Sequence, residues 1–229
     1  MVNSQPLIPS FLTLWQEAKR GKSIYRILTN LALAQWRDEV KGIVLDLACG
    51  KEPSYRRFMN LTGNDTLQLV GVDINPSYHP TVVADLTLPL PFKTESVDAI
   101  ILSGFLHIPP DPERTLQEIR RVLKNGSLLL LTVPFVFHYH PEPTDHWRFT
   151  EEGLKRLLSR SGLLVEELIP IGERWTAVAF LLSPFLRPRW LVAPIVYWLC
   201  LKLDEWTVKK FKRLPRCPIG YVVKARKAK

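Results

Sequence analysis

The sequence contains little cysteine. Its 229 residues include only three cysteines, Cys49, Cys200 and Cys217, and no Cys-x-x-Cys pair. This scarcity argues against a disulfide framework or a zinc ribbon, and it favours a reducing compartment. The N-terminus also lacks a basic region followed by a long apolar run, so the sequence predicts no secretory signal. We therefore expect a cytoplasmic protein.

Apolar runs long enough to cross a membrane are absent as well. Two apolar segments, residues 175–186 and 190–201, are separated by Arg187-Pro188-Arg189. Each would form roughly 18 Å of helix, whereas a bilayer core requires roughly 30 Å. Two interpretations stay open: a buried helical hairpin, or a patch that lies on an anionic membrane. The second is favoured by aromatic residues flanking the runs: Trp175, Trp190, Tyr197, Trp198 and Trp206.

The composition and charge distribution fit a folded protein with a cationic C-terminal segment. Hydrophobic residues make up 46% of the chain, which excludes a disordered chain and argues against a multi-span membrane protein. The formal net charge is +9. From Lys202 onward, ten Lys and Arg residues face only Asp204 and Glu205, so the tail carries +8 of this charge. The tail therefore predicts an anionic surface as its partner.

Apolar runs typical of strands alternate with helical patterns along most of the chain. The runs lie at residues 43–45, 67–73, 81–84, 97–102, 127–133, 163–169 and 219–226. This alternation predicts an α/β fold, a Rossmann-like, mostly parallel seven-stranded sheet with helices on both faces. Residues 1–40, apolar at helical spacing with a break at Gly21, are expected to form a helical cover. We assign 41–170 to the core, 171–217 to an apolar and basic helical insertion, and 218–229 to the last strand and tail.

The first strand leads into a turn of small residues. Asp46 falls where that strand ends, and Ala48 to Gly50 allow a tight turn before a helix expected from Pro53. Asp73 and Asp85 end the next two strands. Because the carboxyl ends of parallel strands share one rim, these carboxylates should line one crevice, with Asp73 suited to accept the hydroxyls of a ribose.

The sequence of these motifs resembles a class I S-adenosylmethionine-dependent methyltransferase of the "type 11" group. The resemblance covers about residues 40–170, and it depends on five stretches: 44–50, 70–74, 84–92, 96–100 and 116–126. It implies the corresponding fold, with residues 41–170 as the S-adenosylmethionine-binding core, and transfer of a methyl group from this cofactor. Three departures from the family pattern are Ala48 in place of glycine, Lys51-Glu52 in place of a small polar residue and glycine, and Leu106 in place of glutamate.

The resemblance also assigns residues to parts of the cofactor. It places Asp46, Ala48, Cys49 and Gly50 at the methionine part, and Ser103 and Gly104 near the same end. It places Asp73 at the ribose, Ile74 against the adenine, and Asp85 with Leu86 at the edge of the adenine ring.

The loop of residues 138–150, after the fifth strand, contains the candidate acceptor-binding residues. Similar loops in related methyltransferases suggest a lid over the acceptor, with Asp145 and Arg148 binding it; alternatively, these two residues pair only to hold the loop. Glu142, Asp145 and three histidines also invite a metal site, but the spacing of His138 and His140 is not convergent, so we expect none. Candidate general bases are His107, His140 and His146.

The favoured function is transfer of a methyl group to a small-molecule, glycan or lipid-linked acceptor, with peripheral contact to an anionic membrane on its cytoplasmic side. An RNA methyltransferase is the second hypothesis, favoured by the basic tail but by no recognisable RNA-binding module, so nucleic acid is the less favoured partner. The third is a catalytically silent binding protein on the same fold, suggested by Lys51-Glu52.

Overall fold

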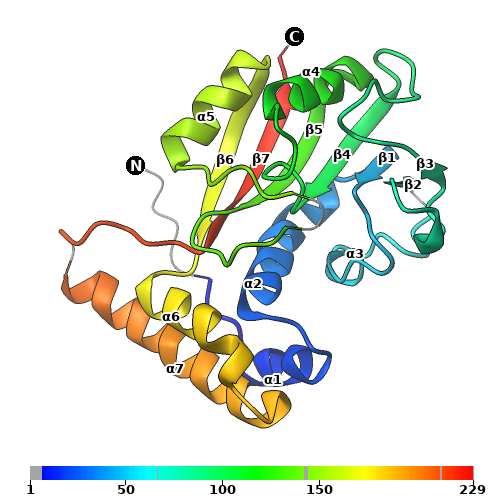
Figure 1. Ribbon diagram of the computed structural model, residues 1–229. Coiled ribbons are helices and arrows are strands. Elements are labelled where there is room, and N and C mark those ends of the chain that lie inside the picture. The colour runs from blue at the N-terminus through cyan, green and yellow to red at the C-terminus, as the bar shows by residue number, and fades with distance from the viewer. Residues whose placement is uncertain (1–6, 66, 142–143, 212, 229) are drawn as a thin grey trace.

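A seven-stranded sheet forms the centre of the computed structural model, which describes residues 7–65, 67–141, 144–211 and 213–228 (Figure 1). The strand order is β3-β2-β1-β4-β5-β7-β6. The strands are β1 Gly42–Leu47, β2 Leu67–Asp73, β3 Val82–Val83, β4 Val97–Ser103, β5 Leu123–Pro134, β6 Leu163–Ile171 and β7 Gly220–Lys227. Only β7 runs antiparallel to its neighbours. The predicted mostly parallel seven-stranded sheet is confirmed.

Some residues named in the sequence analysis lie outside the described ranges. These are residues 1–6 of the helical cover, Glu142 in the loop after β5, and Lys212 and Lys229 in the tail.

The strand order reverses beside β1. The chain adds β2 and β3 on one side of β1 and then returns to add β4 and β5 on the other side. At such a reversal the connections leave in opposite directions, and a crevice opens outside the carboxyl ends of the strands. The residues that end β1, β2 and β4 therefore border one crevice.

Two helices cover one face of the sheet. They are α4, Pro112–Val122, which packs against β5, and α5, Glu151–Arg160, which packs against β6, and both join one apolar cluster with β4 and β5 (Figure 1). Asp111 caps the first helix by accepting a hydrogen bond from the Arg114 N–H at 3.1 Å. Thr150 caps the second in the same way through Gly153. The caps satisfy backbone N–H groups that a helix leaves unpaired at its start.

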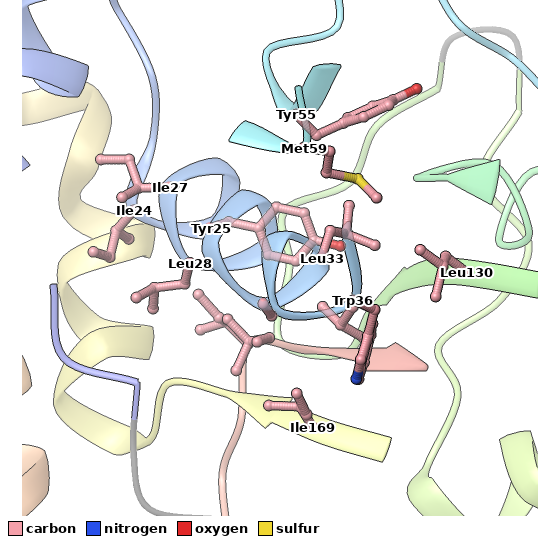
Figure 2. Packing of buried hydrophobic residues seen from close by; sticks show 14 of the residues in the cluster. Ile24, Tyr25, Ile27, Leu28, Leu33, Trp36, Tyr55, Met59, Leu130 and Ile169 are labelled. Atoms are coloured by element: carbon pink, nitrogen blue, oxygen red, sulfur yellow. The ribbon is translucent and has the colours of Figure 1, made fainter. Parts of the chain in front are cut away.

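The predicted helical cover packs on the other face. It consists of α1, Phe11–Lys19, α2, Ile24–Leu33, and the 3-10 helix η1, Ala34–Glu39, with Gly21 at the break in a left-handed conformation. Ile24, Ile27 and Leu28 of α2 are buried, as Figure 2 shows, in a cluster that also contains Leu130 of β5. Leu129 and Leu131 of β5 join the opposite cluster. This alternation follows from the two-residue period of a strand.

The apolar insertion forms a helical hairpin beside α1. Helix α6, Arg174–Leu182, is followed by η3, Ser183–Phe185, and by α7, Arg189–Lys210, and α7 packs against both α6 and α1 (Figure 1). Asp204 of α7 caps α6, since its carboxylate accepts the N–H groups of Trp175 and Thr176 at 2.8 and 2.9 Å. The two helices differ in length from the twelve-residue apolar segments: α6 has 9 residues and α7 has 22. Helix α7 continues past Leu201, where Lys202 and Lys209 pair with Glu205 at helical spacing. Within the described part of the chain, no helix is both long and apolar enough to span a bilayer.

The helix after the first strand is shorter than expected. Helix α3 spans only Tyr55–Phe58, and Asn60 adopts a left-handed conformation two residues later. A four-residue helix sums few peptide dipoles, so the positive end of its dipole contributes little charge here. Positive charge at this loop comes instead from side chains.

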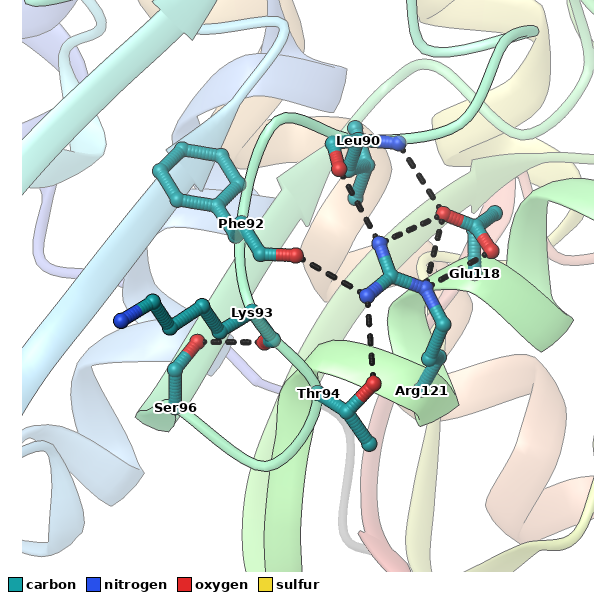
Figure 3. Close-up of polar contacts among 7 residues, drawn as sticks. All are labelled: Leu90, Phe92, Lys93, Thr94, Ser96, Glu118 and Arg121. Carbon is teal, nitrogen blue, oxygen red and sulfur yellow. Dashed lines mark hydrogen bonds and ion pairs between the residues drawn. The ribbon is translucent and has the colours of Figure 1, made fainter.

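A single arginine fixes the segment that follows Asp85. Arg121 of α4 donates to the backbone oxygens of Leu90 and Phe92 at 3.0 and 2.9 Å, and it pairs with Glu118 (Figure 3). Glu118 in turn accepts the Leu90 N–H at 3.0 Å. These bonds replace the strand ladder that a proline-rich segment cannot form, and they fix the chain just before β4, at the end of the sheet away from the crevice.

Candidate active site

The turn after β1 is held against the end of β2. Ala48 and Gly50 both have positive φ, +53° and +62°. The Cys49 N–H donates to the Val72 carbonyl at 3.1 Å, and the Gly50 N–H donates to Asp73 Oδ2 at 2.8 Å. Ala48 thus occupies a backbone conformation that favours glycine, the residue expected there from the family pattern.

Asp46 lies beneath this turn. It is fully buried, and its carboxylate accepts the Tyr55 hydroxyl and the Arg56 Nε–H, the latter at 2.6 Å. Burial raises the pKa of Asp46, and the adjacent Arg56 guanidinium opposes this rise. Asp46 therefore anchors α3 under the loop, and its direct contact with a cofactor stays a prediction. Cys49 is also buried, with its sulfur close to Gly71, where an added Cβ would lie 3.2 Å away.

Asp73 and Asp85 lie at the ends of β2 and β3. The second carboxylate oxygen of Asp73 accepts the Asn75 N–H at 2.9 Å. Ile74 between them is 63% exposed, which is unusual for isoleucine and leaves an apolar surface beside the carboxylate. Asp85 Oδ1 accepts from both the backbone N–H and the hydroxyl of Thr87. The side chain of Leu86 is buried in the core, so only its backbone could contact a ligand at the edge of the sheet.

The end of β4 provides small residues facing open space. Ser103 Oγ lies 3.2 Å from Thr132 Oγ1, and the Gly104 N–H donates to the Thr132 carbonyl at 3.2 Å. A Cβ built on Gly104 or on Gly50 would have no atom within 4 Å. Both glycines have positive φ and border open space, so a ligand can approach the backbone closely at both points.

This donor set fits S-adenosylmethionine. Asp73 supplies a carboxylate for hydroxyl donors, Ile74 an exposed apolar contact, and Gly50 and Gly104 room for close approach. Hydroxyl groups of Ser103 and Thr132 stand at the other end of the crevice. The sequence prediction named these residues except Thr132, which gave no signal because it lies inside an apolar strand.

The loop after β5 folds over the residues that follow β4. The N–H groups of His146 and Trp147 both donate to the His107 carbonyl, at 2.9 and 3.1 Å. The Trp147 indole N–H donates to the Pro109 carbonyl at 2.9 Å, and the Thr144 hydroxyl to that of Ile108. The loop is thereby fixed beside the end of β4. His146 itself is exposed.

Asp145 and Arg148 form the internal brace of this loop. Arg148 donates to both carboxylate oxygens of Asp145, at 2.5 and 2.6 Å, and also to the His138 carbonyl. Asp145 accepts the His140 N–H as well, at 2.9 Å. Hydrogen bonding from Arg148 holds the pKa of Asp145 well below its usual range. The pairing that the sequence left open is therefore present, and contact of either residue with an acceptor stays a prediction.

Three unpaired polar atoms gather near this brace. His107 Nδ1, His140 Nδ1 and the Tyr25 hydroxyl are buried and have no hydrogen-bond partner among the described residues. Burial lowers the pKa of His107 to about 4, so this side chain is neutral at pH 7. Burial raises the pKa of Tyr25 to about 12, and Arg26, Thr132 and Arg148 oppose this rise. Asp145, Arg148 and His140 all act electrostatically on His107, so these groups share one site.

Tyr25 was not predicted. It belongs to α2 in the helical cover, and Figure 2 shows it inside the packed cluster. Its ring contacts Phe137 after β5 and Phe180 of α6, with centroids 5.1 and 6.0 Å apart. The sequence indicated an apolar helix face, and a tyrosine on such a face carried no separate signal. Among the described residues, no group of three or more His, Cys, Asp and Glu could hold a metal ion.

Comparison with known proteins agrees with this geometry. Residues 45–131 match the family described as "Methyltransferase domain". Over these residues the chain is similar to methyltransferases. The matched residues include the turn after β1, the ends of β2, β3 and β4, and most of β5.

Solved structures share the fold of the methyltransferase domain. A SAM-dependent methyltransferase from Archaeoglobus fulgidus superposes with a TM-score of 0.57 at 20% identity, covering 95% of this chain and 100% of that one. Phosphoethanolamine N-methyltransferase 2 of Haemonchus contortus, in complex with S-adenosyl-L-methionine, gives a TM-score of 0.59 at 16% identity, covering 87% of this chain and 52% of that one.

A curated relative matches part of the chain. An uncharacterized protein of Methanocaldococcus jannaschii is 34% identical over 121 residues, or 52% of this chain and 47% of that protein. The chain therefore spans about half the length of the curated relative that it matches.

Proposed function

We propose that the protein transfers a methyl group from S-adenosylmethionine to an acceptor bound between the end of β4, the loop after β5 and helix α2. The observation that carries this proposal is the group of polar atoms of His107, His140 and Tyr25 beside the cofactor crevice, which have no hydrogen-bond partner among the residues that the structure describes. Buried polar groups without partners are costly, and an acceptor that hydrogen-bonds with them would remove this cost.

In this proposal, different residues bind the cofactor, enclose the site and accept a proton. When bound, S-adenosylmethionine supplies an activated methyl group on a sulfonium, so the protein mainly needs to position and enclose the reactants. Asp73, Ile74, Gly50 and Gly104 would hold the cofactor. The Asp145–Arg148 brace and Tyr25 would close the site to water. His107 is neutral at pH 7 and its Nδ1 has no partner within the described part of the chain, so it can accept a proton from a hydroxyl acceptor.

The acceptor we propose is glycan-like, lipid-linked or a hydrophobic small molecule, met at a membrane surface. Support comes from α7, whose side opposite the buried Ala193, Tyr197 and Leu201 is lined by apolar side chains. These residues are 37–52% exposed: Leu191, Ile195, Trp198, Leu199, Leu203 and Trp206. Lys202 and Lys209 lie among them, and such a mixture suits an anionic interface. A localisation on the cytoplasmic side of a membrane is part of this proposal.

Methyl transfer is tested with purified protein, radiolabelled S-adenosylmethionine and lipid, glycan and RNA extracts. We expect label in the lipid or glycan fraction, and mass spectrometry should then find a product heavier by one methylene group. Label confined to RNA would support the second hypothesis. Binding of the cofactor without labelling of any fraction would favour the catalytically silent protein.

Membrane binding is tested by flotation with vesicles. The double variant Ile195→Glu/Trp198→Glu places two charges on the exposed side of α7 and should abolish flotation with anionic vesicles. Leu164→Glu, at a residue of β6 that is 59% exposed, is the matched control and should float like the unaltered protein. If neither the unaltered protein nor the control floats, the membrane part of the proposal is wrong.

A further inference from the structure

A separate cleft lies beside the cofactor loop, between the α1–α2 turn and the residues around α3. Its volume is about 760 Å³. Its charged lining residues are Arg20, Lys22, Lys51, Glu52, Arg56 and Arg57. Five of these six side chains are cationic, and methyl transfer as proposed above uses none of them.

Two of the arginines are held together by one buried carboxylate. Glu17 of α1 is 3% exposed, and its Oε1 accepts from Arg20 at 2.8 Å and from Arg57 at 2.5 Å. Arg20 follows α1, whereas Arg57 belongs to α3, so Glu17 joins the two walls of the cleft. Both arginine side chains stay about half exposed, at 51% and 49%. Two guanidinium groups are thus fixed side by side with free N–H groups.

The third arginine is oriented in the same way. Arg56 donates its Nε–H to the fully buried Asp46 at 2.6 Å, while 25% of its side chain stays exposed. Lys22 and Lys51 make no ion pair within the described part of the chain. The compensating carboxylates Glu17 and Asp46 are buried, so the cleft itself presents mainly positive charge. Electrostatic focusing in a concave surface strengthens its attraction for an anion.

We propose that this cleft binds a phosphate or diphosphate group. Guanidinium groups that are fixed in place match the oxygens of phosphate in a bidentate manner, and lysines add mobile point charges. Ser54 supports this assignment: its Oγ accepts from Asn30 Nδ2 at 2.8 Å, which leaves its own hydroxyl proton free to donate into the cleft. The proposal concerns a second site and stands whether or not methyl transfer occurs.

The test is isothermal titration calorimetry of the full chain with pyrophosphate at constant ionic strength. Lys22→Gln/Lys51→Gln removes two charges that no carboxylate depends on, so this variant should fold and bind pyrophosphate at least about tenfold more weakly. Lys209→Gln/Lys210→Gln removes two charges from α7 and should bind like the unaltered protein. Arg57→Gln should also weaken binding, with thermal melting used to check its fold.

Several results would overturn the proposal. They are no binding of pyrophosphate, equal binding of sulfate and chloride, and equal losses in both lysine double variants. Competition with saturating S-adenosylhomocysteine would also overturn it, because the cations would then belong to the cofactor site.

Vesicles identify the source of the phosphate. Vesicles of phosphatidylcholine with and without phosphatidic acid are compared for the unaltered protein and Lys22→Gln/Lys51→Gln. Recruitment that needs both phosphatidic acid and the two lysines supports a lipid headgroup. Binding of pyrophosphate without such recruitment supports a soluble phosphorylated ligand.

Discussion

Asp73, at the end of β2, accepts the backbone N–H of Gly50 from the turn after β1 at a distance of 2.8 Å. The Asp73 carboxylate therefore holds the turn after β1, and in the proposed function it also binds the ribose of the cofactor.

Asp73→Asn keeps the size of the side chain but loses the charge-assisted bonds, which contribute about 1.5–3 kcal/mol each. We expect it to weaken binding of S-adenosylhomocysteine about tenfold or more by calorimetry. Asp38→Asn, on an exposed side chain, should leave affinity unchanged. Equal affinity of both variants would contradict the role of Asp73.

Ala48 has a left-handed backbone, with φ of +53°. This conformation costs an L-residue roughly 1–2 kcal/mol, partly offset by the flexibility that glycine adds to the unfolded chain. Ala48→Gly should therefore raise the free energy of unfolding by about 0.5–1 kcal/mol, measured by chemical denaturation. Ala32→Gly in the last turn of α2, where the backbone is helical and the side chain is buried, is the opposite control and should lower stability by about 1 kcal/mol or more. A loss of stability in Ala48→Gly would show that the turn is unstrained.

The Asp145–Arg148 brace should govern the order of the loop after β5. Asp145→Asn removes the charge that Arg148 pairs with, and we expect a loss of about 2 kcal/mol in stability. It should also speed amide exchange across the described residues 138–141 and 144–149, measured by hydrogen–deuterium exchange. Lys155→Gln, which breaks an exposed pair with Glu151, should change little.

The brace also gives a pH dependence. The folded-state pKa of Asp145 is depressed, so its contribution is fully present above the ordinary aspartate pKa of about 3.9 and decreases as pH falls below it. Exchange protection of the loop that stayed constant down to pH 2 would contradict this.

His107 should make stability depend on pH between about 6.5 and 4. Its folded-state pKa is about 4, so in this range the unfolded chain binds a proton that the folded chain does not. Stability therefore decreases as pH falls, by up to about 3 kcal/mol from this group. His107→Gln should remove that component from denaturation curves measured at pH 7.5 and pH 4.5. His146→Gln, at an exposed position, should retain it; equal curves for the two variants would rule out a buried neutral His107.

Local patterns were enough to predict much of the core. The predicted strand 67–73 matches β2, Leu67–Asp73, and the break predicted at Gly21 separates α1 from α2. Such features depend on neighbouring residues: an apolar run favours a buried strand, and glycine readily adopts the left-handed backbone conformation that ends a helix. The same applies to Asp46, Asp73 and Asp85, which were located at strand ends from the sequence.

The roles of those residues required the tertiary structure. Asp46 is buried under Tyr55 and Arg56, while Ile74 is exposed. Neither the burial of Asp46 nor the exposure of Ile74 follows from the spacing of residues in the sequence. Tyr25 reaches the rim of the sheet because α2 packs across it, over a hundred residues from the loop that contains Arg148.

The basic cleft has the same origin. In the sequence, nothing distinguishes Arg20 and Arg57 from the other basic residues. In the folded protein, both pair with the buried Glu17 and therefore lie side by side. The sequence pattern indicates which residues can be buried. Contacts between distant segments are determined only by the tertiary structure, because they depend on how the helices and strands pack together.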